Sequence, residues 1–353
     1  MKILMLTTTE FKFNGMSNVI SNYVDFLLRD QKHQVDILSR GEFEDFYKSD
    51  FESKGCTCFG FNKIISYSKF IREYKKIVSE NSYDAIHIHA NSSLVYILLK
   101  YAKKKGIKIR IVHSHSTSCN FPVLNKLLWK QINKYATTKL ACSDVAGRHM
   151  FGSDDFIFVP NAVDVNRCKF SEEERIKIRK SYGIKNEYLI GHIATFSIAK
   201  NHKFLIKILR DLKSKEFDYK AILIGEGPMK QEIMDLAKNL DVEDKIIFAG
   251  KVPNAYTYMS AMDLFVLPSL YEGLPVCLIE AQSVGVPTIY SDTISNQIKI
   301  NENAIPLSIE DSELWANEII KQELKYDFDS AENLINSQFS HYSVSKVICD
   351  LYK

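Results

Sequence analysis

Short apolar stretches alternate with longer segments of helical periodicity along the whole chain. The apolar stretches include KILML, QVDIL, DAIHI, IRIVHS and TKLAC in the first half, and YLIGHIA, KAILIG, KIIFAG, DLFVLP and PTIYS in the second. Such an alternation predicts parallel sheets that are covered by helices. The intervening segments place apolar residues three and four positions apart, which predicts helices over 17–29, 66–80, 91–105, 121–134, 171–181, 201–214, 228–240, 275–284 and 310–323.

The alternation is interrupted once, at the turn around Pro160 and Asn161, and it starts again near residue 185. A chain of 353 residues is also too long for one ordinary hydrophobic core. We therefore expect an α/β protein with two Rossmann-like domains and a crevice at the carboxyl ends of their strands. The predicted segments are an N-terminal domain over 1–165, a C-terminal domain over 166–335, and an amphipathic C-terminal helix over 336–353 that can cross back to the first domain.

Composition indicates an ordinary globular protein that remains in a reducing compartment. Hydrophobic residues make up 46% of the chain and charged residues 25%. The seven cysteines are scattered, and the closest pair, Cys56 and Cys58, does not have the CxxC spacing of a redox or zinc motif. The start of the chain does not resemble a signal peptide, and no run of about 18 apolar residues occurs. We expect a cytoplasmic protein without a membrane-spanning segment.

Charge is distributed unevenly between the two halves. Residues 1–165 contain 23 Lys and Arg against 16 Asp and Glu, a charge of +7, whereas residues 166–353 contain 23 against 27, a charge of −4. Lysines are interleaved with aromatic residues in KIISYSKFIREYKK, YAKKKGIKIR and NKLLWKQINKY. These stretches are either solvated helix faces or a surface for an anionic partner, such as the inner face of a membrane. A nucleic-acid partner is disfavoured, because no recognisable binding module is present and the second half is acidic.

The segment YEGLPVCLIEAQSVGVP at 271–287 contains the main candidate site. Pro275 suits the first turn of a helix, so the amides of Gly273, Leu274 and Val276 lie at a helix start that favours a phosphate. Glu272 and Glu280 flank this start at different depths and are too far apart to share a proton. They suit two hydroxyl groups of one elongated ligand, such as a diphosphate that bridges two sugars. A second anion-binding position is expected where Gly15 precedes a helix capped by Ser17.

These residues resemble the E-x7-E signature of glycosyltransferase family 4, retaining enzymes with the GT-B fold of two facing Rossmann-like domains and an interdomain cleft. FNGMSNVISNYVDFL, YDAIHIHA, VHSHST, LACSDVAGRHMFG, VPNAVDV, AKNHKFLI and IGEGPMK extend the resemblance along the chain. It implies that Glu280 binds the nucleotide ribose, Glu272 the transferred sugar, Lys200 the leaving diphosphate and His115 the sugar. It further implies a nucleotide-sugar donor, with UDP favoured, a lipid-linked saccharide acceptor, and no metal or other cofactor. The enzymes that it most resembles build bacterial capsule, exopolysaccharide or O-antigen.

Two positions depart from the family pattern. Relatives usually have an arginine a few residues before the lysine, where this chain has Thr195. Loss of a charged contact to a buried phosphate removes about 1.5–3 kcal/mol of binding. His192, Lys203 or another cation is expected to compensate. Ala162 replaces the usual glycine of the Pro-Asn-Gly turn, which affects only the geometry of that turn.

Paired histidines and a glycine pair allow other interpretations. His87 with His89, and His113 with His115, have the spacing of strand residues that face one side, which allows a zinc site. A substrate or structural role is favoured, because no cysteine or carboxylate completes a known ligand spacing. The sequence GEGP at 225–228 lacks the third glycine of a dinucleotide-binding fingerprint, which disfavours an NAD enzyme. The serines of HANSS are expected to cap the following helix.

The sequence favours a retaining hexosyltransferase. A non-catalytic protein of the same fold that binds sugar nucleotides is the alternative suggested by Thr195. A second alternative is an epimerase that acts on UDP-GlcNAc. Such an enzyme shares the two-domain architecture, but it converts the nucleotide sugar without an acceptor.

Overall fold

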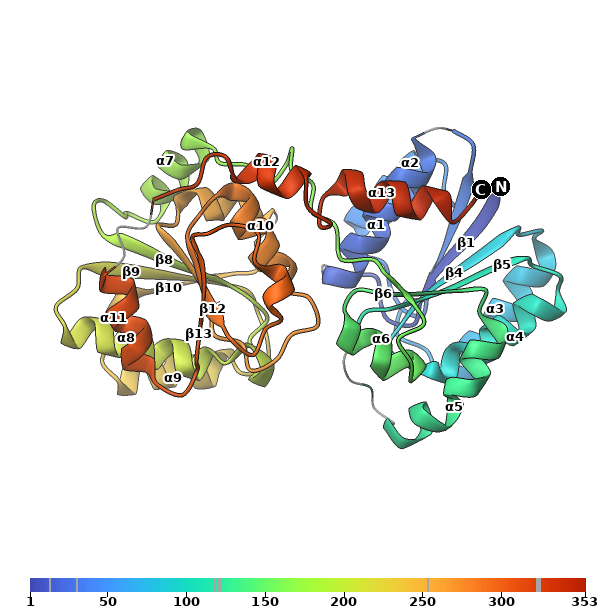
Figure 1. The fold of residues 1–353 in the computed structure, drawn as a ribbon, viewed down its shortest axis with the longest axis horizontal. Helices are drawn as coiled ribbons and strands as arrows, with labels where there is room; N and C mark the ends of the chain where they lie inside the picture. The colour runs from blue at the N-terminus through green and yellow to red at the C-terminus, as the bar shows by residue number, and fades with distance from the viewer. Residues whose placement is uncertain (13, 30, 117–118, 120–121, 253, 322–324) are drawn as a thin grey trace. The chain divides into compact units, whose positions relative to one another are not determined.

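The computed structural model describes residues 1–12, 14–29, 31–116, 119, 122–252, 254–321 and 325–353 of the chain. The chain forms two compact units, one of Met1–Ala162 with Tyr342–Lys353 and one of Val163–His341 (Figure 1). Both chain ends therefore belong to the first unit. Among the described helices, none combines the length and the apolar character needed to cross a membrane.

The first unit is built on a parallel sheet whose strands lie in the order β3-β2-β1-β4-β5-β6-β7. From β1 the chain adds β2 and then β3 toward one edge of the sheet. It then returns to the other side of β1 and adds β4 to β7 toward the opposite edge, which is the doubly wound arrangement. The strands are β1 (Lys2–Thr7), β2 (Gln34–Ser39), β3 (Cys58–Phe59), β4 (Ala85–Ala90), β5 (Ile109–Ser114), β6 (Thr138–Ala141) and β7 (Ile157–Phe158).

Helices cover both faces of this sheet, because successive strand residues alternate between the faces. Ile3 and Met5 pack against one group of helices, and Leu4 and Leu6 against the other. The first group is α1 (Gly15–Leu28), α2 (Asp45–Ser53) and the C-terminal α13 (His341–Asp350). The second group is α3 (Tyr67–Glu80), α4 (Tyr96–Lys104) with the preceding turn η1 (Ser93–Val95), α5 (Pro122–Tyr135) and α6 (Asp144–Phe151).

The second unit repeats the arrangement with a parallel sheet in the order β10-β9-β8-β11-β12-β13. Its strands are β8 (Tyr188–Ile193), β9 (Tyr219–Ile224), β10 (Ile246–Gly250), β11 (Leu264–Leu267), β12 (Thr288–Ser291) and β13 (Ala304–Leu307). One face carries α8 (His202–Ser214), α9 (Lys230–Asn239) and α11 (Ser312–Lys321). The remaining elements are α7 (Glu172–Ser181), η2 (Ile198–Lys200), η3 (Glu243–Lys245), η4 (Ala255–Ala261), α10 (Val276–Val284), η5 (Asn296–Ile298) and α12 (Ser330–Ile335).

Most predicted helices are confirmed within a few residues, and the misses have physical reasons. The predicted cap of the first helix is wrong: Asn14 is the cap, its side chain accepts from the amide of Ser17 at 3.0 Å, and Ser17 lies inside the first turn. Helix α2 was not predicted because it is largely polar and buries only Tyr47 and Phe51. Helix α6 and strand β13 are short and were also missed. Residue 121, where the fourth helix was predicted to begin, lies outside the described residues.

Candidate functional site

The segment between β11 and α10 forms the centre of the candidate site. Strand β11 ends at Leu267, and α10 begins at Val276, with Pro275 as the residue before the helix rather than in its first turn. The helix ends at Gly285, whose left-handed φ of +82° is typical of a glycine that ends a helix. This places Gly273 and Leu274 in the loop that leads into the helix.

Several backbone amides at the start of α10 have no hydrogen-bond partner among the residues that the structure describes. Leu278 donates to the carbonyl of Pro275 at 3.1 Å. Within the described ranges, no hydrogen-bond acceptor is found for the amides of Gly273, Leu274, Val276 or Cys277. Unpaired amides at a helix start carry partial positive charge and favour an anion.

A lysine and a glutamate from two different loops form an ion pair in the second unit. The Nζ atom of Lys200 donates to Glu272 Oε1 at 2.5 Å, and Ser269 donates its hydroxyl proton to the same oxygen at 2.7 Å. The two loops are joined because the amide of Leu270 donates to the carbonyl of Ala199 at 2.8 Å. Ser269 is a site residue that the sequence prediction missed, although it lies only three positions before Glu272.

Glu280 lies in the second turn of α10 and is partly buried. Burial raises the pKa of its carboxyl group to about 7, and the nearby positive charge of Arg167 acts in the opposite direction. No hydrogen-bond partner is found for this carboxyl group in the part of the chain that the structure describes. Arg167 is a second residue that the sequence prediction missed, because it lies two positions after the VPNAVDV segment and belongs to no recognised motif itself.

The charged side chains surround the first turn of α10. Burial raises the pKa of the Cys277 thiol to about 12; the positive charge of Lys200 lowers it, and the negative charges of Glu272 and Glu280 raise it. All three charges are therefore close enough to act on this thiol. The structure thus brings Lys200, Glu272, Glu280 and the open amides together within one unit.

The expected substitutes for the missing arginine do not supply a free charge at this site. Thr195 is exposed after the carboxyl end of β8. His192 contacts the carbonyl oxygen of Val266 through Nδ1 at 2.8 Å, and burial lowers the pKa of its ring to about 4, so it is neutral at pH 7. Lys203 forms an ion pair with Glu232.

The glycines of GEGP serve the packing of this edge of the sheet. Gly225 has φ of +143°, and a Cβ atom there would lie 2.0 Å from the carbonyl oxygen of Ala194. A Cβ atom at Gly227 would lie 2.4 Å from the carbonyl oxygen of Phe196. Both glycines are needed because the loops after β8 and β9 run against each other.

In the first unit, Gly15 lies at the start of α1 and His115 follows β5. A Cβ atom at Gly15 would meet no atom within 4 Å, so local packing does not require glycine there. The ring of His115 is engaged within the unit, because its Nε2 lies 2.8 Å from Nδ1 of His89. Burial lowers the pKa of His115 to about 3, so the ring is neutral.

The paired histidines form a stack under α1 and α13. The ring nitrogens of His87, His89 and His113 lie within 4.8 Å of one another, a separation that could hold a metal ion. However, the rings of His87 and His89 stack at 4.4 Å between centroids with an interplanar angle of 13°, so their lone pairs do not converge on one point. His87 also lies 2.7 Å from the hydroxyl of Tyr352. In the HANSS segment, Ser92 caps η1 as predicted, whereas Ser93 is buried and donates to the carbonyl of Met150.

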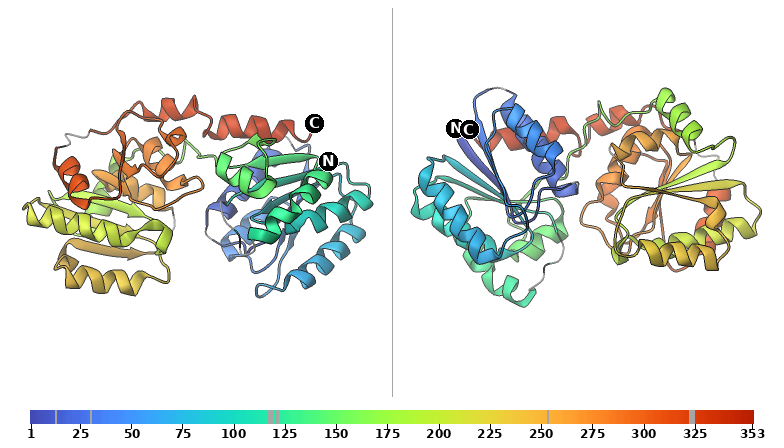
Figure 2. Two further views of the ribbon diagram at one scale, coloured as in Figure 1. Left: turned by 60° about the horizontal axis from the view of Figure 1, so that its bottom comes forward. Right: turned by 180° about the vertical axis from the view of Figure 1, so that it is seen from behind.

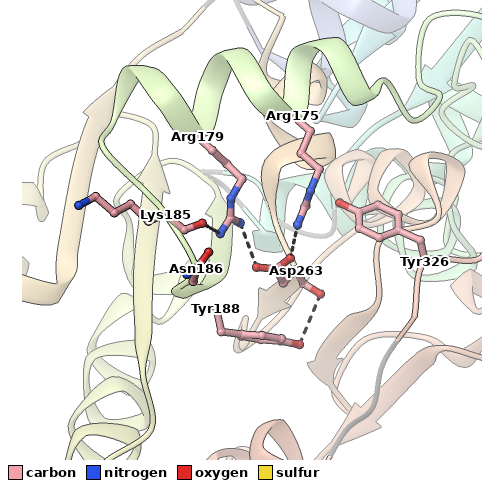
Figure 3. A pocket seen from close by; sticks show the side chains of 7 residues that line it. All are labelled: Arg175, Arg179, Lys185, Asn186, Tyr188, Asp263 and Tyr326. Carbon is pink, nitrogen blue, oxygen red and sulfur yellow. Dashed lines mark hydrogen bonds and ion pairs between the residues drawn. The ribbon is translucent and has the colours of Figure 1, made fainter.

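A separate cavity of about 500 Å³ lies at the opposite edge of the second sheet, where β8 and β11 begin (Figure 3). Asp263 accepts from Arg175 at 2.6 Å and from Arg179 at 3.0 Å. Both guanidinium groups also donate to carbonyl groups at the end of η4. This network fixes α7 to the sheet, and it is remote from Glu272, which follows the carboxyl end of β11.

Comparison with known proteins identifies two family profiles along the chain. Residues 13–167 match "Glycosyltransferase Family 4", and residues 174–338 match "Glycosyl transferases group 1". The Bacillus subtilis protein EpsF, which is assigned as a glycosyltransferase, is 32% identical over 71% of this chain and 69% of its own length. The Escherichia coli UDP-Gal:α-D-GlcNAc-diphosphoundecaprenol α-1,3-galactosyltransferase is 22% identical over 70% of this chain and 68% of its own length.

Solved structures give the same fold. Anabaena HepE, crystallised in complex with UDP-glucose, matches with a TM-score of 0.81 over 100% of this chain and 99% of its own, at 19% identity. WaaG, a glycosyltransferase involved in lipopolysaccharide biosynthesis, matches with a TM-score of 0.75 at 14% identity, over 99% of each chain. Together with the family profiles and EpsF, these matches show that the chain belongs to the family 4 and group 1 glycosyltransferases, enzymes of the GT-B fold.

Proposed function

We propose that this glycosyltransferase moves a hexose or N-acetylhexosamine from a UDP-sugar to a lipid-linked saccharide, with retention of the anomeric configuration, in the biosynthesis of a surface polysaccharide. The observation that carries the proposal is the Lys200–Glu272 pair, 2.5 Å apart, in the loop region that leads into α10 with its open amides. An ammonium group and unpaired amides suit a diphosphate, and carboxylates on either flank suit hydroxyl groups.

Each residue of the cluster takes one part of the donor. The diphosphate accepts hydrogen bonds from four backbone amides around Pro275, those of Gly273, Leu274, Val276 and Cys277. Lys200 neutralises the diphosphate as it leaves. Glu280 accepts hydrogen bonds from the ribose, and Glu272 from the transferred sugar. The contacts predicted for Gly15 with the diphosphate and for His115 with the sugar remain predictions.

Glycosyl transfer from a nucleotide diphosphosugar depends mainly on stabilisation of the leaving diphosphate, and less on a general base. As the bond between the anomeric carbon and the phosphate oxygen breaks, negative charge develops on the diphosphate and positive charge on the sugar ring. Fixed donors aimed at the diphosphate lower this barrier. The acceptor hydroxyl forms the new bond from the same face, and its proton passes to the departing phosphate oxygen, so the protein supplies no general base and no metal.

Two relatives support the choice of substrates. HepE was crystallised in complex with UDP-glucose, and the Escherichia coli relative transfers galactose from UDP-Gal to a diphosphoundecaprenol-linked sugar, as its name states. By analogy we assign a UDP-sugar as the donor and a polyprenyl-diphosphate-linked saccharide as the acceptor of this chain.

A donor screen followed by turnover tests the proposal. Thermal shift measurements across UDP-, GDP- and dTDP-sugars should give stabilisation by one UDP-sugar, and Glu280→Ala should abolish it. Glu243→Ala, at an exposed glutamate of the same unit, is the matched control and should retain the shift. Addition of acceptor should then release UDP, with an α-linked product from an α-linked donor by NMR. Conversion of the UDP-sugar without acceptor would indicate an epimerase, and binding without any conversion would indicate a scaffold, as Thr195 suggests.

A further inference from the structure

Helix α5 exposes large apolar side chains at its start. Val123 is 73% exposed, Leu127 72% and Leu124 41%. The opposite side of the helix packs into the unit through Asn125 and Ile132, which are buried. Three large apolar side chains in two turns are therefore held in solvent by a helix that is anchored from behind, which is unusual for a surface helix.

The outer side of α5 changes from apolar residues at its start to lysines in its second half. Lys130 and Lys134 lie seven and eleven positions after Val123, so they continue the line of Val123 and Leu127 on one side of the helix. Lys126 lies beside this line, and all three lysines are exposed. Helix α5 thus has an apolar first half and a basic second half on its outer side.

The neighbouring helices extend the positive charge. Figure 2 shows α3, α4 and α5 side by side on one face of the first sheet, and each is in contact with the next. The ring of Tyr135 lies 5.8 Å from Lys103 Nζ and 5.7 Å from Lys134 Nζ, and Tyr101 lies in the same way near Lys75 and Lys105. We call these exposed lysines the basic face; they are Lys75, Lys76, Lys103, Lys104, Lys105, Lys126, Lys130 and Lys134.

In the described part of the chain, the lysines of the basic face have no acidic partners. Among the described residues, none of its eight lysines forms an ion pair, whereas lysines elsewhere in the unit, such as Lys54 with Asp25, do. A partner that suits this surface must offer an anionic layer to the lysines and, directly beyond that layer, an apolar one to Val123, Leu124 and Leu127. The headgroups and acyl chains of a bilayer supply both in this order.

We infer that the start of α5 inserts Val123, Leu124 and Leu127 into a membrane that contains anionic lipid, while the basic face contacts the headgroup phosphates. The biological role of this membrane contact rests on the proposed function, since a lipid-linked acceptor lies at a membrane surface. A polyanion such as RNA would use the lysines but leave the apolar tip in water. A second copy of the chain would bring the same lysines against one another.

Vesicle flotation of the full chain tests the inference. The chain should bind vesicles of phosphatidylglycerol and phosphatidylcholine at low ionic strength, and bind vesicles of pure phosphatidylcholine at least about tenfold more weakly, because each lysine near an anionic surface contributes roughly fivefold in affinity. Binding should weaken as salt is added. Equal binding to both kinds of vesicle, or binding that does not respond to salt, would overturn the inference.

Two variants separate the apolar tip from the charge. Val123→Ser with Leu127→Ser should reduce the partition coefficient roughly tenfold or more, since each side chain loses most of its burial in the acyl region. Lys126→Gln with Lys130→Gln should reduce it by about 25-fold at low salt and weaken the salt dependence without removing it, because six lysines of the basic face remain. Ile176→Ser, at a residue of α7 that is 60% exposed, is the matched control and should bind as the unmodified chain does.

The remaining outcomes also decide the matter. Unchanged vesicle binding in the Val123→Ser, Leu127→Ser variant would exclude insertion of this tip. Sedimentation that reveals a dimer abolished by the same variant, or retention on RNA in preference to vesicles, would assign the surface to those partners instead. Stabilisation by UDP-sugars is measured without vesicles, so failure of the donor screen would remove the proposed function and leave the vesicle result standing.

Discussion

The Nζ atom of Lys200 lies 2.5 Å from Oε1 of Glu272, although 72 positions separate the two residues in the chain. Glu272 accepts a hydrogen bond from the hydroxyl of Ser269, and the backbone carbonyl of Ser269 accepts one from the hydroxyl of Thr293 at 3.0 Å. The ammonium group therefore has a fixed position beside the start of α10 before any donor binds. A cation that needs no reorganisation is the arrangement that most favours a leaving diphosphate.

Replacement of Lys200 by methionine should therefore slow turnover far more than it weakens the fold. Removal of one preorganised charge or donor at a developing anion typically lowers kcat by about 10² to 10³. The expected result is a loss of this size in UDP release from the UDP-sugar. Lys203→Met is the control, because Lys203 pairs with Glu232 at the surface and should retain nearly full turnover. Similar rates for the two variants would argue against a role for Lys200 in the reaction.

Glu280→Gln should stabilise the empty protein and weaken its binding of UDP. The folded state raises the pKa of Glu280 to about 7 from the usual 4.5, so the group favours folding below pH 4.5 and opposes it increasingly as pH rises toward 7. Removal of the charge should add about 1–3 kcal/mol to the free energy of unfolding at pH 7.5. Chemical denaturation measures this gain, and titration with UDP measures the loss of affinity. A variant that is less stable than the unmodified chain at this pH would contradict the explanation.

The same carboxyl group predicts a pH dependence of donor binding. A carboxylate accepts hydrogen bonds from ribose hydroxyls better than its protonated form does. Affinity for UDP should therefore decrease as pH falls below 7, by up to about tenfold per pH unit. Calorimetric titrations between pH 6 and 8 measure the change, and the Glu280→Gln variant should not show it. A Kd for UDP that stays constant over this range would exclude ionised Glu280 as a ribose ligand.

The order and type of most elements could be predicted from the sequence because both sheets are buried on both faces. Buried parallel strands are continuous apolar runs, such as DAIHI and DLFVLP, and the helices between them have a clear periodicity. Helix α2 lacked this signal, since only Tyr47 and Phe51 face the core. The cap of α1 was misplaced by three residues because both Asn14 and Ser17 are suitable capping residues.

The candidate site was predictable only where a motif marked it. Glu272, Glu280 and Lys200 stand in recognisable segments, whereas Ser269 and Arg167 reach the site through the fold alone. Likewise, nothing in the sequence indicates that His115 would bond to His89 within a stack of four neighbouring rings. Periodicity places each of these histidines on a strand, but the contact between strand ends depends on the register of β4 and β5, in which His89 lies opposite His113.

The C-terminal helix should contribute strongly to the stability of the first unit. Val344, Ile348 and Tyr352 are buried in the same core cluster as residues of α1 and β1. Ile348→Ala should lower the free energy of unfolding by about 2–5 kcal/mol, because it leaves a cavity in this cluster. Lys346→Ala, at an exposed position of the same helix, should change it by less than about 0.5 kcal/mol. Denaturation followed by circular dichroism measures both, and equal effects would show that α13 is not part of the folded core.

The histidine stack should make the first unit sensitive to acid. Burial lowers the pKa of His87 and of His115 from 6.5 to about 3, so the folded state keeps both rings neutral while the unfolded chain protonates them. Their contribution is fully present above pH 6.5 and is lost progressively as pH falls toward 3, by at most about 1.4 kcal/mol per pH unit for each ring. His87→Phe combined with Tyr352→Phe removes one titrating ring together with the hydroxyl group that contacts it. Free energies of unfolding measured at several pH values between 4.5 and 7 should fall less steeply in this double variant. Because one fewer proton separates its folded and unfolded states, an unchanged slope would mean that the His87 ring takes up its proton without unfolding.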